Sequence, residues 1–320
     1  MLEPVDLGHD ITLIDLFDLK MTERTGSYVL RAEELTIIET SASPSIPYLL
    51  DGLKKININP DDVKHIIVTH IHLDHSGGVG LLLQSCPNAK VYVHPRGKRH
   101  LADPSRLIQS AKMVYGEKFD ELFDPILPVP EDRLVTMEDG ETLDIGGRIL
   151  TFYDTPGHAN HHFSIHDSLS NGIFTGDTIG VHYSKASTDD FVFVLPSTSP
   201  NQFDPNVMLQ SLRRIEKLNV DYIFFGHYGN THLVEQVYNQ IRHWVPKFVQ
   251  SGEKVLNEFP EASMEYQVDL LAKMLDEMVG TFLEGKHMTR TNEVYQYLQL
   301  DLQVCSMGII DYLMKINSKG

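Results

Sequence analysis

Four side chains that can bind metal crowd one short stretch of the chain, IIVTHIHLDHSGG. They are His70, His72, Asp74 and His75, and a Gly-Gly turn follows them. On an extended strand alternate residues share a face, so His70 and His72 point the same way and can chelate one ion. Asp74 and His75 straddle the turn, where the backbone changes direction and can aim both at a second ion. A structural histidine needs only a hydrogen-bond partner, so this density predicts a metal site.

A third ligand for His70 and His72 is needed, because a catalytic zinc usually takes three protein ligands and keeps one position for water. The stretch TPGHANHH supplies it. His158 follows a strand end and a Pro-Gly turn, which is a suitable place to project an imidazole into a cleft. We expect His161 and His162 to support the ligands through hydrogen bonds or to lie at the surface.

The second ion needs partners for Asp74 and His75. Asp177 in FTGDT and His227 in IFFGHYG each come at the end of an apolar run. Alone, the aspartate would be an ordinary cap and the Gly-His pair an ordinary turn. Together they complete two ligand sets with Asp177 as the bridge: His70, His72 and His158 for one ion, and Asp74, His75 and His227 for the other.

Composition limits the classes of protein to consider. The chain has 320 residues, 42% hydrophobic and 22% charged, and a net charge of −17, which argues against binding nucleic acid or anionic membranes. No basic segment opens the sequence and no run approaches the ~18 apolar residues of a membrane span, so we expect a cytoplasmic protein. Only Cys86 and Cys305 are present, so histidine and carboxylate must hold any metal.

Hydrophobic patterning predicts the elements that position these residues. Strands are expected over 11–17, 27–32, 35–40, 65–70 and 91–95, with helices over 45–56 and 78–85 and a helical segment over 105–124. Further strands follow between 126 and 178, with a hairpin turn at 168–172, and then a helix over 204–218 and a strand over 220–227. This order predicts two sheets with helices on their outer faces, which is a four-layer αββα sandwich of the α+β class.

The last part of the chain differs in character. Apolar residues recur at helical spacing in two stripes: Met264, Val268, Leu271, Leu275, Met278 and Phe282, then Val294, Leu298, Leu302, Cys305 and Ile309. We therefore expect a first domain over residues 1–250 and a helical C-terminal extension over 251–320. The extension is expected to form one wall of a substrate pocket, or to pair with a second copy of the chain as a homodimer.

The stretch HIHLDH resembles the HxHxDH signature of the metallo-β-lactamase fold hydrolases, and His158, Asp177 and His227 match the later ligands of that family in order. The resemblance runs from about Ile11 to Gly229. It implies that domain 1–250 is hydrolase-like, with a dinuclear centre at one edge of the sandwich. It also implies two divalent metal ions, zinc first and Mn or Fe as alternatives.

Two features depart from the familiar members. Glu39 in IETSAS stands where a supporting carboxylate is usually shorter. The antibiotic-hydrolysing members use a cysteine near the second metal, whereas this chain offers Asp177, which directs attention beyond β-lactams.

The chemistry expected of such a centre is hydrolysis. Two divalent ions lower the pKa of a shared water from ~15.7 towards neutrality and polarise the electrophile. Asp74 can serve as ligand and as orienter of the hydroxide. Tyr183 or Tyr228 is placed by sequence to support the substrate oxygen, with packing at a loop as the equal alternative.

The leading function is cleavage of an ester, thioester or lactone bond in a small acyl substrate. The insert over 184–200 carries Phe191 and Phe193, which would frame a partly apolar pocket. The alternatives are a phosphodiesterase, a di-iron redox enzyme and a non-catalytic metal-binding regulatory protein. The redox branch of this fold carries a flavodoxin-like domain, for which residues 235–320 look helical and too short.

Overall fold

The computed structural model describes residues 2–318, and the chain divides into two compact units. The first unit comprises Met1–Asp154, His161–Gly176 and Val220–His232, and the second comprises Thr155–Asn160, Asp177–Asn219 and Leu233–Gly320. The boundary expected at residue 250 falls inside a helix of the second unit, α8, which spans Val234–Glu258. Because the units are interleaved in sequence, the chain passes between them several times.

A seven-stranded sheet forms half of the first unit, in the order β1 to β7. The strands are β1 Val5–Asp6, β2 Ile11–Asp15, β3 Gly26–Leu30, β4 Thr36–Ile38, β5 His65–Ile67, β6 Lys90–Val93 and β7 Leu134–Thr136. Strands β1 to β4 are antiparallel, and β4 to β7 are parallel. The parallel strands β4 and β5 are short and fully buried, as the centre of a parallel sheet requires, whereas the edge strand β7 is partly exposed.

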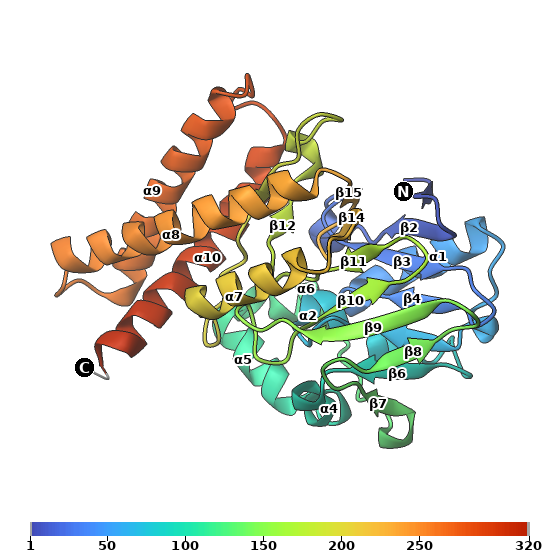
Figure 1. The fold of residues 1–320 in the computed structure, drawn as a ribbon. Helices are drawn as coiled ribbons and strands as arrows, with labels where there is room; N and C mark the ends of the chain where they lie inside the picture. The colour runs from blue at the N-terminus through green and yellow to red at the C-terminus, as the bar shows by residue number, and fades with distance from the viewer. Residues whose placement is uncertain (1, 319–320) are drawn as a thin grey trace. The chain divides into compact units, whose positions relative to one another are not determined.

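A six-stranded sheet in the order β15-β14-β11-β10-β9-β8 packs on the first (Figure 1). Its strands are β8 Thr142–Asp144, β9 Ile149–Asp154, β10 Phe163–Asp167, β11 Gly172–Phe174, β14 Tyr222–Phe224 and β15 Asn230–Thr231. The core between the sheets is aromatic, with Tyr28 from one sheet against Phe174 and Phe224 from the other. The hairpin expected at residues 168–172 joins β10 to β11.

Helices cover the outer face of the seven-stranded sheet. They are α1 Ile46–Lys55, α2 Leu73–Ser76, α3 Val79–Leu82, α4 Pro95–Ala102, α5 Ser105–Tyr115 and α6 Phe119–Phe123. The helical segment expected over 105–124 is in fact two helices. Gly116 adopts a φ of 55° and ends α5, which sequence periodicity alone does not reveal.

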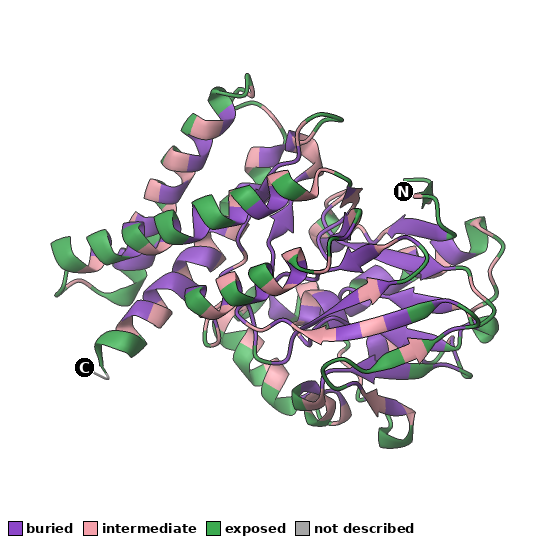
Figure 2. Cartoon of the chain, in the orientation of Figure 1, coloured by how far each residue is buried: buried purple, intermediate pink, exposed green. Residues whose placement is uncertain are grey.

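The second unit contains a two-stranded sheet and four helices. The elements are β12 Val181–His182, β13 Val194–Leu195, α7 Pro205–Glu216, α8, α9 Met264–Glu284 and α10 Val294–Asn317. Asp204 and Ser263 cap α7 and α9, each accepting hydrogen bonds from the first turn. Helices α8, α9 and α10 turn their buried residues towards one another (Figure 2), and all five members of the second apolar stripe are buried.

None of the helices described within residues 2–318 is long and apolar enough to cross a membrane.

One buried ion pair supports the hairpin that carries β10 and β11. Arg148 donates two hydrogen bonds of 2.7 Å to the Asp167 carboxylate, and Ser170 N donates another of 3.0 Å. Burial raises the pKa of Asp167, but the hydrogen bonds from Arg148 and Ser170 outweigh it and hold that pKa below its usual value. The pair therefore stabilises the fold above the unfolded pKa of the carboxyl group.

We expect Asp167→Asn to lower the free energy of unfolding by about 3 kcal/mol at neutral pH, because it leaves Arg148 buried without a charged partner. The loss should shrink as the pH falls through the lowered pKa of Asp167, where the native carboxyl is also protonated. Urea unfolding at several pH values measures both effects. Asp62→Asn, at an exposed position, is the control, and equal losses in the two variants would contradict the account.

Candidate metal centre

Asp74, His75 and His227 come together in the first unit from three segments of the chain. Asp74 and His75 lie on α2, which is separated from the end of β5 by five residues, and His227 follows β14. The Asp74 Oδ2 atom is 3.8 Å from His75 Nε2 and 3.7 Å from His227 Nε2. Their ligand atoms all lie within 4.8 Å of one another. The structure thus brings together the three residues expected from the sequence for the second ion.

The separations within this triad suit a shared cation. They exceed the 2.7–3.2 Å of an ordinary hydrogen bond. Two donors bound to one tetrahedral zinc at about 2.1 Å would stand roughly 3.4 Å apart. A divalent ion therefore fits between the three donors with small adjustments of the side chains.

Glu39 holds one member of the triad in place. Its Oε2 atom lies 3.0 Å from His75 Nδ1, and its Oε1 atom accepts a 2.9 Å hydrogen bond from Thr69 N. With Nδ1 bonded to the carboxylate, His75 presents Nε2 to Asp74. The longer side chain at this position therefore supports the centre, and Glu39 reaches it from a left-handed backbone conformation with φ 68°.

His70 and His72 lie beside the triad. Their ring centroids are 4.7 Å apart, and the ring of His70 is 4.1 Å from that of His75. Thr69 Oγ1 lies 3.0 Å from His70 Nδ1, which leaves Nε2 for a ligand role. The strand expected over 65–70 ends at Ile67, so His70 and His72 lie between β5 and α2 and not on one strand face, although their rings are neighbours.

His161 and His162 are buried and belong to the same cluster of rings. The His162 ring lies 5.0 Å from that of His70, and the His161 ring lies 5.4 Å from that of His72. Of the two placements expected from the sequence, the structure excludes the surface. A side chain at Gly176 would meet His162 Nε2 at 2.5 Å, so this glycine is what admits the imidazole.

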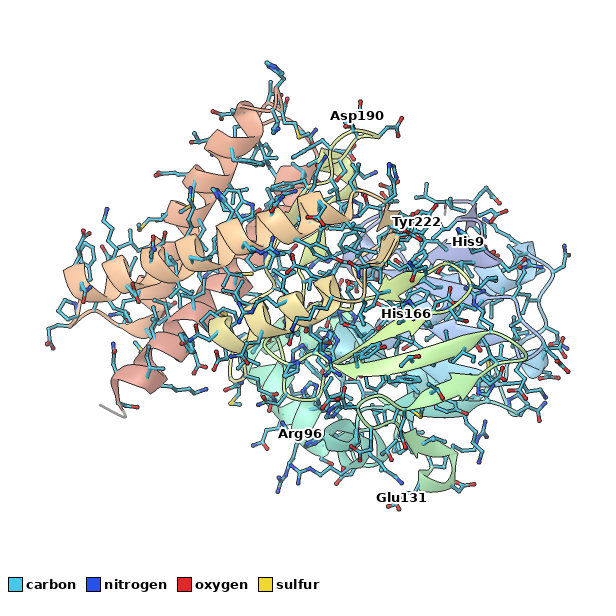
Figure 3. All side chains as sticks on the ribbon, viewed as in Figure 1. His9, Arg96, Glu131, His166, Asp190 and Tyr222 are labelled. Atoms are coloured by element: carbon cyan, nitrogen blue, oxygen red, sulfur yellow. The ribbon has the colours of Figure 1, made fainter. Side chains whose placement is uncertain are left out.

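Other histidines of the first unit have ordinary structural partners. His166 bonds to Asn171 Oδ1 at 3.0 Å within the hairpin, and His9 packs edge-on against Tyr222 with ring centroids 5.3 Å apart (Figure 3). His65 lies between Glu34 and Tyr92. His9 and His166 are far in sequence from the crowded motif, whereas His65 directly precedes it and is set apart only by its partners.

His158 and Asp177 lie together in the second unit. His158 Nε2 is 3.6 Å from Asp177 Oδ2, a spacing like those of the triad. Ser197 contacts both: its carbonyl oxygen lies 3.0 Å from His158 Nδ1, and its hydroxyl donates a 3.0 Å hydrogen bond to Asp177 Oδ2. No local pattern singles out Ser197, because its contacts with His158 and Asp177 are long-range.

The two candidate tyrosines are both largely buried. Tyr183 donates a 3.0 Å hydrogen bond to Asp301 Oδ2 on α10. Tyr228 belongs to the core between the sheets and adopts a φ of 52°, and burial raises its pKa. Their roles towards a substrate remain predictions.

Asp18 is a buried carboxyl group near the triad that sequence patterning did not reveal. It follows β2, in a turn where Phe17, Leu19 and Lys20 all have positive φ, and it pairs with Arg24 at 3.3 Å. Burial raises the pKa of Asp18 to about 6; the Arg24 guanidinium opposes this rise and the Asp74 carboxylate adds to it. A lone aspartate in a charged turn carries no motif by which it could be found.

The model of the metallo-beta-lactamase superfamily matches residues 24–227, which include Asp74, His75 and His227. The chain belongs to this superfamily. The αββα fold class and the helical C-terminal region predicted from the sequence are confirmed.

The named relatives differ in the share of their length that this chain matches. A metallo-beta-lactamase fold-containing protein of Sulfurisphaera tokodaii is 31% identical over 206 residues, covering 63% of this chain and 72% of that protein. The solved structure of an archaeal superfamily member from Sulfolobus tokodaii gives a TM-score of 0.60 at 26% identity, covering 73% of this chain and 85% of that chain.

Two other relatives bear more specific names. A putative diflavin flavoprotein of Nostoc is 25% identical over 224 residues, which are 66% of this chain but 35% of that protein. An N-acyl homoserine lactonase of Bacillus thuringiensis is 29% identical over 182 residues, which are 56% of this chain and 61% of the lactonase. This chain therefore spans about a third of the flavoprotein and less than two thirds of the lactonase.

We expect Glu39→Gln to weaken zinc binding by ~10 to 100-fold, the usual cost of losing a group that orients a ligand. Competition with a chromogenic chelator measures the affinity. Glu34→Gln is a matched control, because Glu34 also pairs with a histidine, at 2.7 Å from His65, outside the cluster. Equal affinities in the two variants would show that Glu39 does not support the centre.

Proposed function

We propose that the protein is a metal-dependent hydrolase that cleaves an ester, thioester or lactone bond in a small acyl substrate. The observation that carries the proposal is the triad of Asp74, His75 and His227, whose donor atoms are spaced for a shared cation and backed by Glu39. Membership of the superfamily supports it.

We further propose that His158 and Asp177 complete the ligand sets predicted from the sequence. Chain connectivity supports this. Asp177 directly follows Gly176, and consecutive Cα atoms are about 3.8 Å apart. A Cβ atom built on Gly226 would lie 3.1 Å from Gly176 Cα and 2.8 Å from His75 Cε1, so the residue before Asp177 is beside the triad.

His158 is constrained in a similar way by the chain. It lies in the loop over residues 155–160, which leaves the end of β9 and returns at His161, whose ring belongs to the histidine cluster. Both ends of this loop join residues of the first unit, and this connectivity supports His158 as a ligand. The full proposed set is His70, His72 and His158 with Asp74, His75 and His227, and Asp177 between them.

Two divalent ions held by this set would supply a hydroxide nucleophile at neutral pH and polarise the scissile carbonyl. Residues of the chain would have defined roles around these two ions. Glu39, Thr69 and Ser197 fix the ring nitrogens of the histidines, so the ligand atoms face inwards before substrate arrives. Asp74 is a ligand that is also 28% exposed, so it can orient the nucleophile from the open side.

The donor set favours zinc and also accepts Mn or Fe, because imidazole and carboxylate ligands suit all three. The acyl substrate class is supported by the likeness to a lactonase and by Asp177, where the antibiotic-hydrolysing members use a cysteine. Phe193 is fully buried against Phe282 and Tyr183, whereas Phe191 is partly exposed. Of the two phenylalanines in the insert, Phe191 is therefore the one suited to meet an acyl chain.

A substrate panel tests the proposal directly. The zinc-loaded protein should hydrolyse at least one of a set of acyl lactones, thioesters and aryl esters, and Asp74→Asn should lower kcat/KM by ~100-fold or more, since it removes a ligand charge at the centre. Hydrolysis of bis(4-nitrophenyl) phosphate in preference to every acyl substrate would favour a phosphodiesterase. No turnover of any substrate by the loaded protein would contradict the enzyme assignment.

We expect Asp177→Ala to reduce activity more than His161→Ala or His162→Ala. Asp177 is proposed as the bridging ligand, whereas losing a supporting histidine typically costs ~10 to 100-fold. Steady-state kinetics at saturating zinc gives the comparison, with His166→Ala as a control for substitution of a histidine away from the cluster. A larger loss for His161→Ala than for Asp177→Ala would overturn the assignment of the ligands.

A further inference from the structure

The segment Pro196–Ser199, which we call the strap, connects the candidate ligands of the second unit to the last helix. It follows β13 directly and lies between His158 and Asp177 on one side and α10 on the other. All of these residues belong to the second unit. The strap is therefore a route along which contacts within this unit run from α10 to both candidate ligands.

The ligand side of the strap is held by Ser197. Its backbone carbonyl lies 3.0 Å from His158 Nδ1 and can accept the ring proton, which directs His158 Nε2 towards Asp177. Its hydroxyl donates a 3.0 Å hydrogen bond to Asp177 Oδ2. One residue thus fixes the ring orientation of one ligand and the carboxylate rotation of the other.

The helix side of the strap is held by three contacts with α10. Thr198 Oγ1 donates a 2.8 Å hydrogen bond to the Cys305 carbonyl, and the Cys305 thiol donates to the Pro196 carbonyl at 3.4 Å. Gly308 allows the closest approach, because a Cβ atom there would lie 1.9 Å from Thr198 O. Thr198 and Cys305 are both buried, so water does not compete for these bonds.

The same helix also contacts the proposed catalytic tyrosine. Asp301 of α10 accepts a 3.0 Å hydrogen bond from Tyr183, which follows β12, the partner of β13. Asp301, Cys305 and Gly308 are spaced by four and three residues, so they lie on one face of the helix. One face of α10 therefore meets Tyr183 and the strap.

We propose that Ser197 is a positioning residue for His158 and Asp177, and that α10 fixes it through the strap, so that the C-terminal helix sets how tightly the centre holds its metal. The proposal rests on the proposed function, because it takes His158 and Asp177 as ligands. Groups that orient ligands strengthen metal binding because they hold the ligand atoms in place before the metal arrives. When these groups hold the ligands loosely, the metal affinity falls even though every ligand is present.

Zinc affinity, measured by competition with a chromogenic chelator, is the primary test. Ser197→Ala should lower the affinity for the more weakly bound zinc by ~10 to 100-fold. Ser197→Thr, which keeps the hydroxyl, should restore most of that affinity. Gly308→Ala should also lower the zinc affinity without altering any ligand, since its added methyl group displaces the strap. Far-UV circular dichroism and thermal melting of the zinc-free proteins report whether each variant folds.

Matched controls separate this effect from general damage. Ser306→Ala removes a buried hydroxyl that bonds within α10 to Leu302 O, and Gly285→Ala adds a methyl group where the nearest atom is 3.3 Å away. Both should keep the zinc affinity of the wild type. Thr198→Val, which removes the bond to Cys305 without adding volume, replaces Gly308→Ala if that variant does not fold.

The outcomes distinguish this proposal from the function on which it rests. Weaker zinc binding in Ser197→Ala and in Gly308→Ala or Thr198→Val, with normal controls, supports it. Unchanged affinity in these variants alongside loss of zinc in Asp177→Ala overturns the role of the strap and leaves the ligand set intact. Unchanged zinc binding in Asp177→Ala itself overturns the assignment of Asp177 as a ligand and with it the role of the strap, whereas the hydrolase proposal, which is carried by the triad, is tested by the substrate panel.

Discussion

Every imidazole has two ring nitrogens, and the candidate centre depends on which of them is hydrogen-bonded to the rest of the protein. In three of the histidines Nδ1 lies 3.0 Å from a fixed oxygen: Thr69 Oγ1 for His70, Glu39 Oε2 for His75 and Ser197 O for His158. The Glu39 carboxylate and the Ser197 carbonyl can only accept, so they set the tautomers of His75 and His158, whereas the Thr69 hydroxyl, which can donate or accept, orients the ring of His70. A metal centre built this way is oriented before any ion arrives.

The surrounding fold holds these hydrogen-bonding partners of the histidines in place. Buried polar groups are costly unless they are bonded, so the aromatic core between the sheets and the polar cluster at the strand ends are kept separate. Tyr28 contributes to both, since its ring packs in the core while its hydroxyl lies 2.6 Å from the carbonyl oxygens of Phe225 and Gly229, on either side of His227. Core packing thus fixes the turn that carries one ligand.

Much of this arrangement follows from the sequence because it is local. The density of metal-binding side chains in HIHLDH predicts a site there, and the order of elements predicts the sandwich, but the expected period of two does not place the histidines, because β5 ends at Ile67. What sequence reasoning missed depends on contacts between distant residues. Glu39 is singled out only through the family resemblance, and its contact with His75 spans 36 positions; Asp18 is buried beside the triad without a motif. The strap joins Ser197 to a helix about a hundred residues later, which no local pattern encodes.

A homodimer and a cytoplasmic location stay predictions.

The central claim is that the chain holds two metal ions side by side. Anomalous diffraction at the zinc absorption edge, from crystals of the zinc-loaded protein, locates such ions independently of activity. The account predicts two peaks about 3.5 to 4 Å apart, one beside His70, His72 and His158 and the other beside Asp74, His75 and His227, with Asp177 between them. A single peak, or peaks bound by His161 or His162 in place of His158, would contradict it.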